Sequence, residues 1–370
     1  MTKEVGLIKV ESPATQVFRQ TLLLAFIAMV PMLFASCCIT AFAVGDTLLA
    51  AFAFLMCIVS VYSLGTTFIA IPLGMYLSLQ YRKGNYAKID AAYSRSIRLV
   101  NMLPLRRSWA MSTMLSNLAL MRLCQGYYDS AETLFAQAVD YVRKDKRLAR
   151  HYFSAILLNN HAVACLRQDK FIEAELLATE AMEIMDLKKN RSPKLNVVRA
   201  LINGAHGIAR LEHGELDDAE RFLKKACQLH ESEESMSSLG ATTRTQAHVM
   251  CYFGLALVFA RQKKLDDSER ACDRAYSIMN STNGACTMNL LALRGLNLLA
   301  NEYMNNGLYD RAEKVLEDAY VIGGNFPFHK DAQNTLSYFE KLFLLTKRND
   351  EIADMRKWLH PVTSISGPVK

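Results

Sequence analysis

Charged side chains are nearly missing from one long stretch of this sequence. The 62 residues from Gln20 to Tyr81 contain a single charged residue, Asp46. An ordinary globular domain is about one quarter charged. About 20 uncharged, mostly apolar residues are enough to cross the hydrocarbon core of a bilayer as one helix. The composition of this stretch therefore predicts insertion into a membrane.

Two segments of this stretch are long enough to span. They run from Thr21 to Val44 and from Thr47 to Ala70, and the turn-forming pair Gly45-Asp46 separates them. A cleavable signal peptide would have a shorter apolar core and no second one behind it. We expect a two-helix transmembrane hairpin over residues 20–71, in contact with membrane lipids, after a cytoplasmic segment at 1–19.

The motifs of common enzyme classes are also absent. The sequence has no nucleotide-binding glycine loop between a strand and a helix, no G-x-S-x-G and no H-E-x-x-H. Its eight histidines are scattered, and no strand-like alternation of useful length occurs. We expect no enzymatic activity and no cofactor.

The nine cysteines lack the dense spacing of a disulfide scaffold, which indicates a reducing compartment for the part of the chain beyond the hairpin. One pairing leaves an alternative open, because Cys227-x-x-His230 and His248-x-x-Cys251 are two ligand pairs of a type that can hold zinc. The preferred interpretation is that both cysteines are small core residues. We expect no metal.

One pattern recurs along the rest of the chain. After the turn residue Gly126, the residues Tyr128, Ala131, Phe135 and Ala138 share one side of a helix. A weaker copy lies around residues 348–359, and the intervals between the six clear copies are 42, 43, 45, 49 and 44 residues. The six clear copies begin at Gly84, Gly126, Asp169, Gly214, Lys263 and Gly307.

This pattern resembles the tetratricopeptide repeat (TPR), and the long period with the phrases SNLAL (116–120) and LNNHAV (158–163) resembles the extended repeats of kinesin light chains. Ile89 and Ser268 stand where alanine is usual. The resemblance implies an all-α fold, a right-handed α-solenoid of six to seven helix-turn-helix repeats over 72–360, followed by a disordered tail at 361–370. The apolar first helices are expected at 111–124, 153–167, 198–212, 247–261 and 290–305.

Repeats of this family usually bind proteins, so the expected function is that of a membrane-anchored interaction scaffold whose concave groove binds a peptide or protein partner. The alternative is an accessory or regulatory subunit that binds partners through its hairpin. Seven Lys or Arg and one acid lie between Arg82 and Arg107. Next to a membrane, such a basic stretch indicates the orientation of the protein in the membrane and contact with anionic lipids. We expect no nucleic-acid partner.

In this family the first helix of each pair lines the groove. Asn117 and Asn160 each lie nine residues before a turn residue, and an asparagine amide can pair with the main chain of an extended peptide. The equivalent positions Met75, Ala205 and Gly254 interrupt this series. The full set of expected groove residues is Asn117, Asn160, Arg122, Arg167, Asn297 and Asn301.

The two arginines of this set could supply charge for an acidic partner. The other interpretation of the asparagines is that they only cap helices or bond between them.

Basic residues predict the orientation in the membrane. Lys3, Lys9 and Arg19 flank the first span and Arg82, Lys83 and Lys88 flank the second, whereas the turn between the spans has no positive residue. Because Lys and Arg flanking a span stay cytoplasmic, both ends and the repeats are expected in the cytoplasm. Protease added outside sealed cells should leave the repeats intact and should cleave them after permeabilisation. Cleavage in sealed cells would reject this orientation.

Overall fold

The computed structural model describes residues 86–102, 108–192, 195–232, 241–281, 286–324 and 330–352, with five isolated positions between 32 and 43. Apart from those five positions, the expected hairpin at 20–71 lies outside the described residues, as do the first helix of the first repeat and the tail at 361–370. Among the described helices, none combines the length and the apolar character needed to cross a bilayer.

All regular secondary structure in the described ranges is helical. The elements are α3 (Tyr86–Met102), α4 (Ser108–Cys124), α5 (Tyr128–Arg143), α6 (Tyr152–Leu166), α7 (Phe171–Asp186), η1 (Lys188–Asn190), α8 (Asn196–Glu212), α9 (Leu216–Glu231), α10 (Ala241–Arg261), α11 (Leu265–Ser281), α12 (Cys286–Asn305), α13 (Tyr309–Gly323) and α14 (Lys330–Leu345). The all-α class expected from the sequence is thus confirmed for these ranges.

The chain forms two compact units. The first comprises Met1–Leu118 with Asp140–Asp145, and the second comprises Ala119–Val139 with Lys146–Lys370. In the first unit, Met111 and Met114 of α4 are buried against Ile97 of α3 and against Tyr141.

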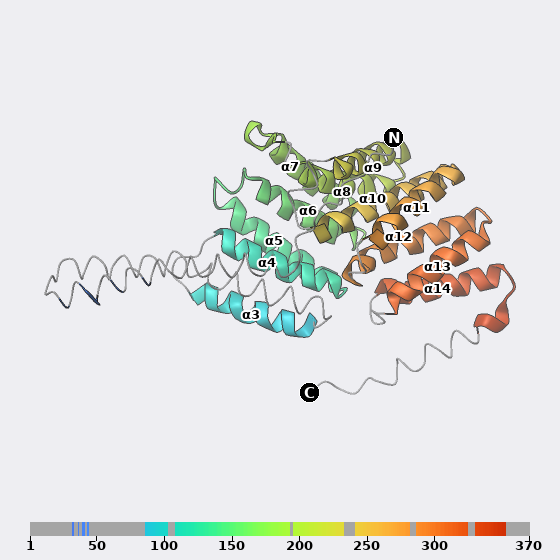
Figure 1. Cartoon of the computed structure of the whole chain (residues 1–370), viewed down its shortest axis with the longest axis horizontal. Coiled ribbons are helices and arrows are strands. Elements are labelled where there is room, and N and C mark those ends of the chain that lie inside the picture. The colour runs from blue at the N-terminus through green and yellow to red at the C-terminus, as the bar shows by residue number, and fades with distance from the viewer. Residues whose placement is uncertain are drawn as a thin grey trace, which may run out of the picture. The chain divides into compact units, whose positions relative to one another are not determined.

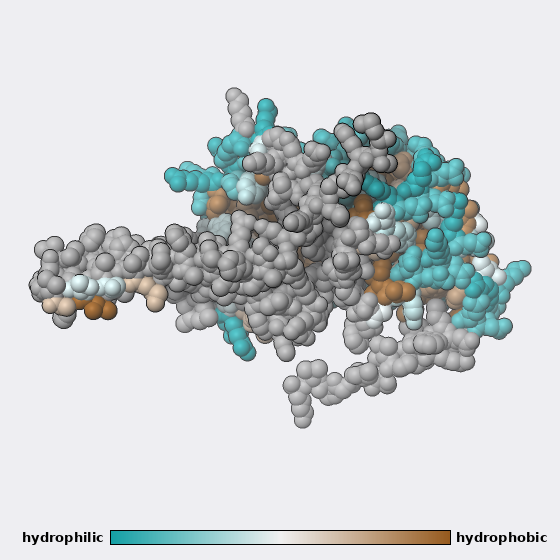
Figure 2. All heavy atoms as spheres, viewed as in Figure 1, coloured by the Kyte–Doolittle hydropathy of each residue, from teal (hydrophilic) through white to brown (hydrophobic). Residues whose placement is uncertain are grey.

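The second unit has two layers of helices (Figure 1). α6, α8, α10, α12 and α14 contact one another in succession and form one layer. α7, α9, α11 and α13 each pack against the helix that precedes them and form the other layer. Hydrophilic side chains cover much of the described surface visible in Figure 2, with smaller apolar patches between them. This is the stacking of helix pairs that the repeat pattern predicts.

Each helix pair turns at a residue with a left-handed backbone. The φ angles are 75° to 81° at Gly126, Gly214 and Gly307, and 60° to 62° at the non-glycine positions Asp169, Lys263 and Lys347. In all six turns the next N–H donates to the carbonyl five residues earlier, the closing bond of a helix C-cap. Five of these residues are the turn residues expected from the sequence, and Lys347 adds the turn of the last, weaker copy.

Small side chains let the two helices of a pair approach. The residue five positions after the turn is at most 1% exposed in five repeats: Ala131, Ala174, Ala219, Ser268 and Ala312. The departure at Ser268 is accommodated, because its hydroxyl oxygen lies 2.7 Å from the carbonyl oxygen of Ala256 and 3.0 Å from the Tyr303 hydroxyl. Serine therefore keeps both the small volume and a satisfied polar group.

Several element boundaries differ from the sequence expectation. α10 begins at Ala241 and α12 at Cys286, ahead of the expected starts at residues 247 and 290. The added residues of α10, ATTRTQ, are largely polar, so apolar periodicity did not reveal them. The structure also adds α14 as the first helix of the last pair, and η1 lies inside a segment expected to be only a connection.

The turn residues give a test of backbone strain. Lys263→Gly should raise the free energy of unfolding by about 0.5–1 kcal/mol, because glycine adopts a positive φ without the clash of a Cβ. Gly307→Ala should lower it by about 1 kcal/mol through the backbone alone, since an added Cβ meets no atom within 4 Å. Denaturant titration of both variants measures these changes. Shifts of the same sign in the two variants would contradict this account of the turns.

Candidate functional site

A cavity of about 120 Å³ lies in the second unit, in the layer formed by α6, α8, α10 and α12. Its lining residues recur at fixed distances before the turns, because each repeat presents the same face of its first helix. Six residues before their turns, α6, α8 and α10 contribute Val163, Ile208 and Leu257. Nine residues before their turns, α8, α10 and α12 contribute Ala205, Gly254 and Leu298.

Small residues form part of the lining. Ala205 and Gly254 occupy the positions at which the expected asparagine series is interrupted, and both line the cavity. Gly204 lets α8 approach α10 closely, because a Cβ built there would lie 2.9 Å from the Sγ of Cys251. The two small residues that interrupt the asparagine series therefore belong to the wall of the cavity.

Four polar side chains join this apolar lining: Asn159, Arg167, Glu212 and Arg294. Asn159 is only 3% exposed, and its Oδ1 has no hydrogen-bond partner among the described residues. A buried acceptor without a partner costs on the order of 1–3 kcal/mol. Asn159 thus presents an unused acceptor in the wall of an apolar cavity.

A buried ion pair lies at the edge of the site. Nη1 of Arg167 is 3.3 Å from Oδ2 of Asp331 in α14, and both side chains are less than 10% exposed. The hydroxyl of Tyr128 in α5 donates to the same carboxylate at 3.5 Å. Burial and the charge of Asp331 raise the pKa of Tyr128 to about 12. Tyr128 therefore stays protonated and remains a donor at neutral pH.

Further bonds hold α12 and α14 in place. Nδ2 of Asn297 donates to the backbone oxygen of Asp331 at 2.7 Å, and its Oδ1 accepts from Thr335 at 2.9 Å. Arg294 of α12 donates to Oδ1 of Asp169 at 2.5 Å and to the backbone oxygen of Leu166 at 3.3 Å. The layer of first helices is therefore curved enough for α12 and α14 to bond with the C-terminal end of α6.

The six expected groove residues do not share one environment in the structure. Arg167 lines the cavity, and Asn297, which is 2% exposed, meets the same Asp331. Asn301 accepts from Nζ of Lys341 at 2.6 Å. Asn160 is half-buried and, although it adjoins Asn159, is not among the residues that line the cavity.

The remaining two are engaged elsewhere. Asn117, in the first unit, is hydrogen-bonded to Tyr93, whose pKa burial raises to about 12. The guanidinium carbon of Arg122 lies 5.5 Å from the ring centroid of Tyr127. Contact of any of the six with a partner stays a prediction. The sequence did not predict the cavity residues Asn159, Glu212 and Arg294. For Asn159 a signal was present, because Val163, Leu166 and Arg167 follow it by four, seven and eight residues and so share one face of the helix with it.

The possible zinc ligands that the sequence offered lie at the contact of α9 and α10. Cys227 and Cys251 are both buried, and their side chains are hydrogen-bonded to each other. The rings of His230 and His248 have centroids 5.1 Å apart. No three of these four place their donor atoms within 4.8 Å of one another in the described structure. The pair of cysteines behaves as part of the core.

Comparison with known proteins supports the repeat assignment. Residues 110–186 match the family model of the tetratricopeptide repeat, and no curated protein matches the sequence. A Rap protein complexed with Competence and Sporulation Factor is 14% identical, over 90% of this chain and 88% of its own, with a TM-score of 0.51. This likeness shows a shared fold.

Two other solved structures are similar with lower scores. BtubC from P. vanneervenii is 16% identical over 70% of this chain and 92% of its own, with a TM-score of 0.47. A putative kinesin light chain from Podosopora anserina is 17% identical over 60% of this chain and 98% of its own, with a TM-score of 0.39. The family match confirms the TPR prediction for residues 110–186. The extended, kinesin-light-chain type of the whole array stays a prediction.

The buried ion pair gives a stability test. Asp331→Asn should lower the free energy of unfolding by about 3–5 kcal/mol, because it leaves a buried guanidinium without its carboxylate. The double variant Arg167→Met, Asp331→Leu should lose less than this single change, since it removes both charges. Asp218→Asn, which breaks the exposed pair with Arg221, should cost about 0–1 kcal/mol. Equal losses for the buried and the exposed single variants would contradict this reading.

Proposed function

We propose that the protein is a membrane-anchored interaction scaffold whose cavity between α6, α8, α10 and α12 receives a peptide segment of a partner protein. The observation that carries the proposal is Asn159, whose buried Oδ1 has no hydrogen-bond partner in the described structure and lies in an apolar wall. A main-chain N–H of a bound peptide would satisfy this acceptor, while an apolar side chain of the peptide fills the hollow.

The charges around the cavity favour an apolar peptide segment over a strongly charged one. Arg167 is paired with Asp331, and Arg294 is paired with Asp169. Oε2 of Glu212 lies 4.0 Å from Nη2 of Arg261. Because each charge already has an opposite partner, shape and apolar contact supply the affinity. An acidic partner would have to displace one of these pairs.

Two further observations support binding and anchoring. Repeat folds of this kind typically serve interaction, and the Rap protein of similar fold was solved with a bound factor. Anchoring is proposed from the sequence alone, because the 62 residues from 20 to 81 carry one charge. The same stretch favours the second candidate, an accessory subunit that meets its partner within the membrane.

Capture of the partner from native membranes, followed by binding assays, tests the cavity. Asn159→Ala should weaken binding by more than about fivefold, which corresponds to about 1 kcal/mol for a lost hydrogen bond. The matched control is Asn160→Ala, the adjacent residue, which does not line the cavity. If the cavity alone binds the peptide, this control keeps full binding, whereas the groove predicted from the sequence requires that changing both Asn117 and Asn160 to Ala weakens binding.

A second variant blocks the cavity without touching Asn159. Leu201→Arg places a charge in the apolar lining, whereas Leu176→Arg changes a leucine of α7 that is 66% exposed. Loss of binding in the first variant alone supports the cavity. Full binding by a well-folded Leu201→Arg variant, and loss of binding when an unrelated hairpin replaces residues 20–71, would favour the membrane-mediated alternative.

A further inference from the structure

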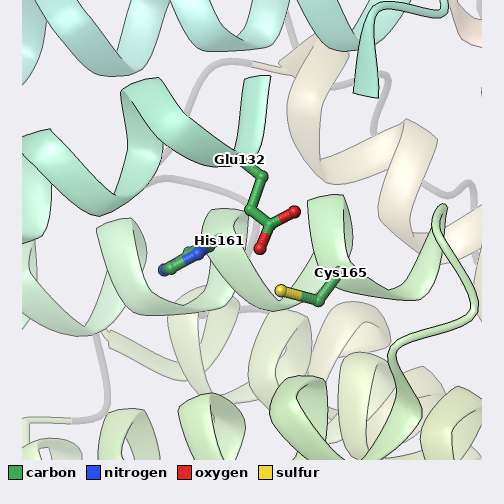
Figure 3. A group of neighbouring side chains, drawn as sticks. All are labelled: Glu132, His161 and Cys165. Carbon is green, nitrogen blue, oxygen red and sulfur yellow. The ribbon is translucent and has the colours of Figure 1, made fainter. Parts of the chain in front are cut away.

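A second group of side chains lies on the side of α6 that faces away from the cavity. His161 and Cys165 are four residues apart and share one face of this helix, whereas Asn159 and Val163 line the cavity from the opposite face. Glu132 of α5 points toward both (Figure 3). One donor atom from each of the three residues lies within 4.8 Å of the other two.

The three donors are a carboxylate, an imidazole and a thiol. Zinc binds such oxygen, nitrogen and sulfur atoms at about 2.0–2.3 Å, which places neighbouring donors around one ion on the order of 3.5 Å apart. The three donor atoms, now within 4.8 Å of one another, would therefore move closer by on the order of 1 Å when a cation binds. The thiol and the imidazole favour zinc over magnesium or calcium, which prefer oxygen ligands.

We propose that Glu132, His161 and Cys165 form a binding site for a zinc-class divalent cation that ties α5 to α6, with a fourth coordination position left for water or another ligand. This site is independent of the proposed partner-binding function, because none of its three residues lines the cavity. From the sequence we expected no metal, because the recognisable pairs of possible ligands were the cysteines and histidines of α9 and α10.

Two neighbours compete for the carboxylate. Oε2 of Glu132 accepts from Nε2 of Gln168 at 2.6 Å and from Nζ of Lys170 at 2.7 Å. The side chain of Lys170 is 41% exposed, so it can turn into solvent when a cation approaches. A lysine and a divalent cation at one carboxylate repel each other. Removing Lys170 should therefore strengthen cation binding.

Cobalt(II) is the probe of choice, because a thiolate ligand gives a sulfur-to-cobalt charge-transfer band in the near ultraviolet. The full-length protein, purified with a chelator and then freed of it, should bind about one cobalt ion per chain with this band, and zinc should displace the cobalt. Cys165→Ser should abolish the band. His161→Gln and Glu132→Gln should each weaken binding by at least about 10–100-fold, the loss typical even of outer-shell changes.

Matched variants separate this site from other thiols. Cys272→Ser changes another buried free cysteine of the same unit and should leave the cobalt band intact. Lys170→Ala should raise the affinity for cobalt several-fold, an effect that a purely structural Glu132–Lys170 pair does not produce. Since Cys165 is buried and its variant could fail to fold, the partly exposed Glu132→Gln variant provides the same test on a folded chain.

Three outcomes overturn the proposal. The first is a folded wild-type protein that binds neither cobalt nor zinc. The second is an unchanged affinity for cobalt in a folded Glu132→Gln variant. The third is loss of the band in Cys227→Ser but not in Cys165→Ser, which would move the site to the contact of α9 and α10.

Discussion

The left-handed turn at the end of each first helix is the constraint on which the rest of the described structure depends. Six of the described residues adopt a positive φ, and three of them are not glycine. Each turn reverses the chain within a few residues, so the following helix packs directly on the preceding one. The small residue five positions later then lets the two axes approach. In the second unit, repetition of this pairing places α6, α8, α10, α12 and α14 in one layer.

Local chemistry of this kind could be predicted from the sequence. Gly126, Gly214 and Gly307 stand where a left-handed turn favours glycine, and the alanines behind them recur with helical spacing. Asp169 and Lys263 carry the Cβ that disfavours a positive φ, yet their place in the period identified them as turns. The described helices of the second unit therefore agree with the expected array, apart from their polar starts and α14.

The candidate site could not be predicted in the same way, because it depends on contacts between residues far apart in the sequence. The Arg167–Asp331 pair joins residues 164 positions apart, and no local pattern marks its partner. Ala205 and Gly254 line the cavity, but in the sequence they stand only as gaps in a series of asparagines. Glu132 comes from a helix separate from that of His161 and Cys165, so only the packing of α5 on α6 brings the three together.

The central claim, that a partner peptide lies in the cavity of the first-helix layer, is tested most directly by site-specific photocrosslinking in the native membrane. A photoreactive side chain at Leu201, in the lining of the cavity, is compared with one at Leu176, on the exposed face of α7. The account predicts one discrete crosslinked product from position 201, lost on mutation of Asn159 to Ala, and none from position 176. Crosslinking from position 176 with none from position 201 would contradict it.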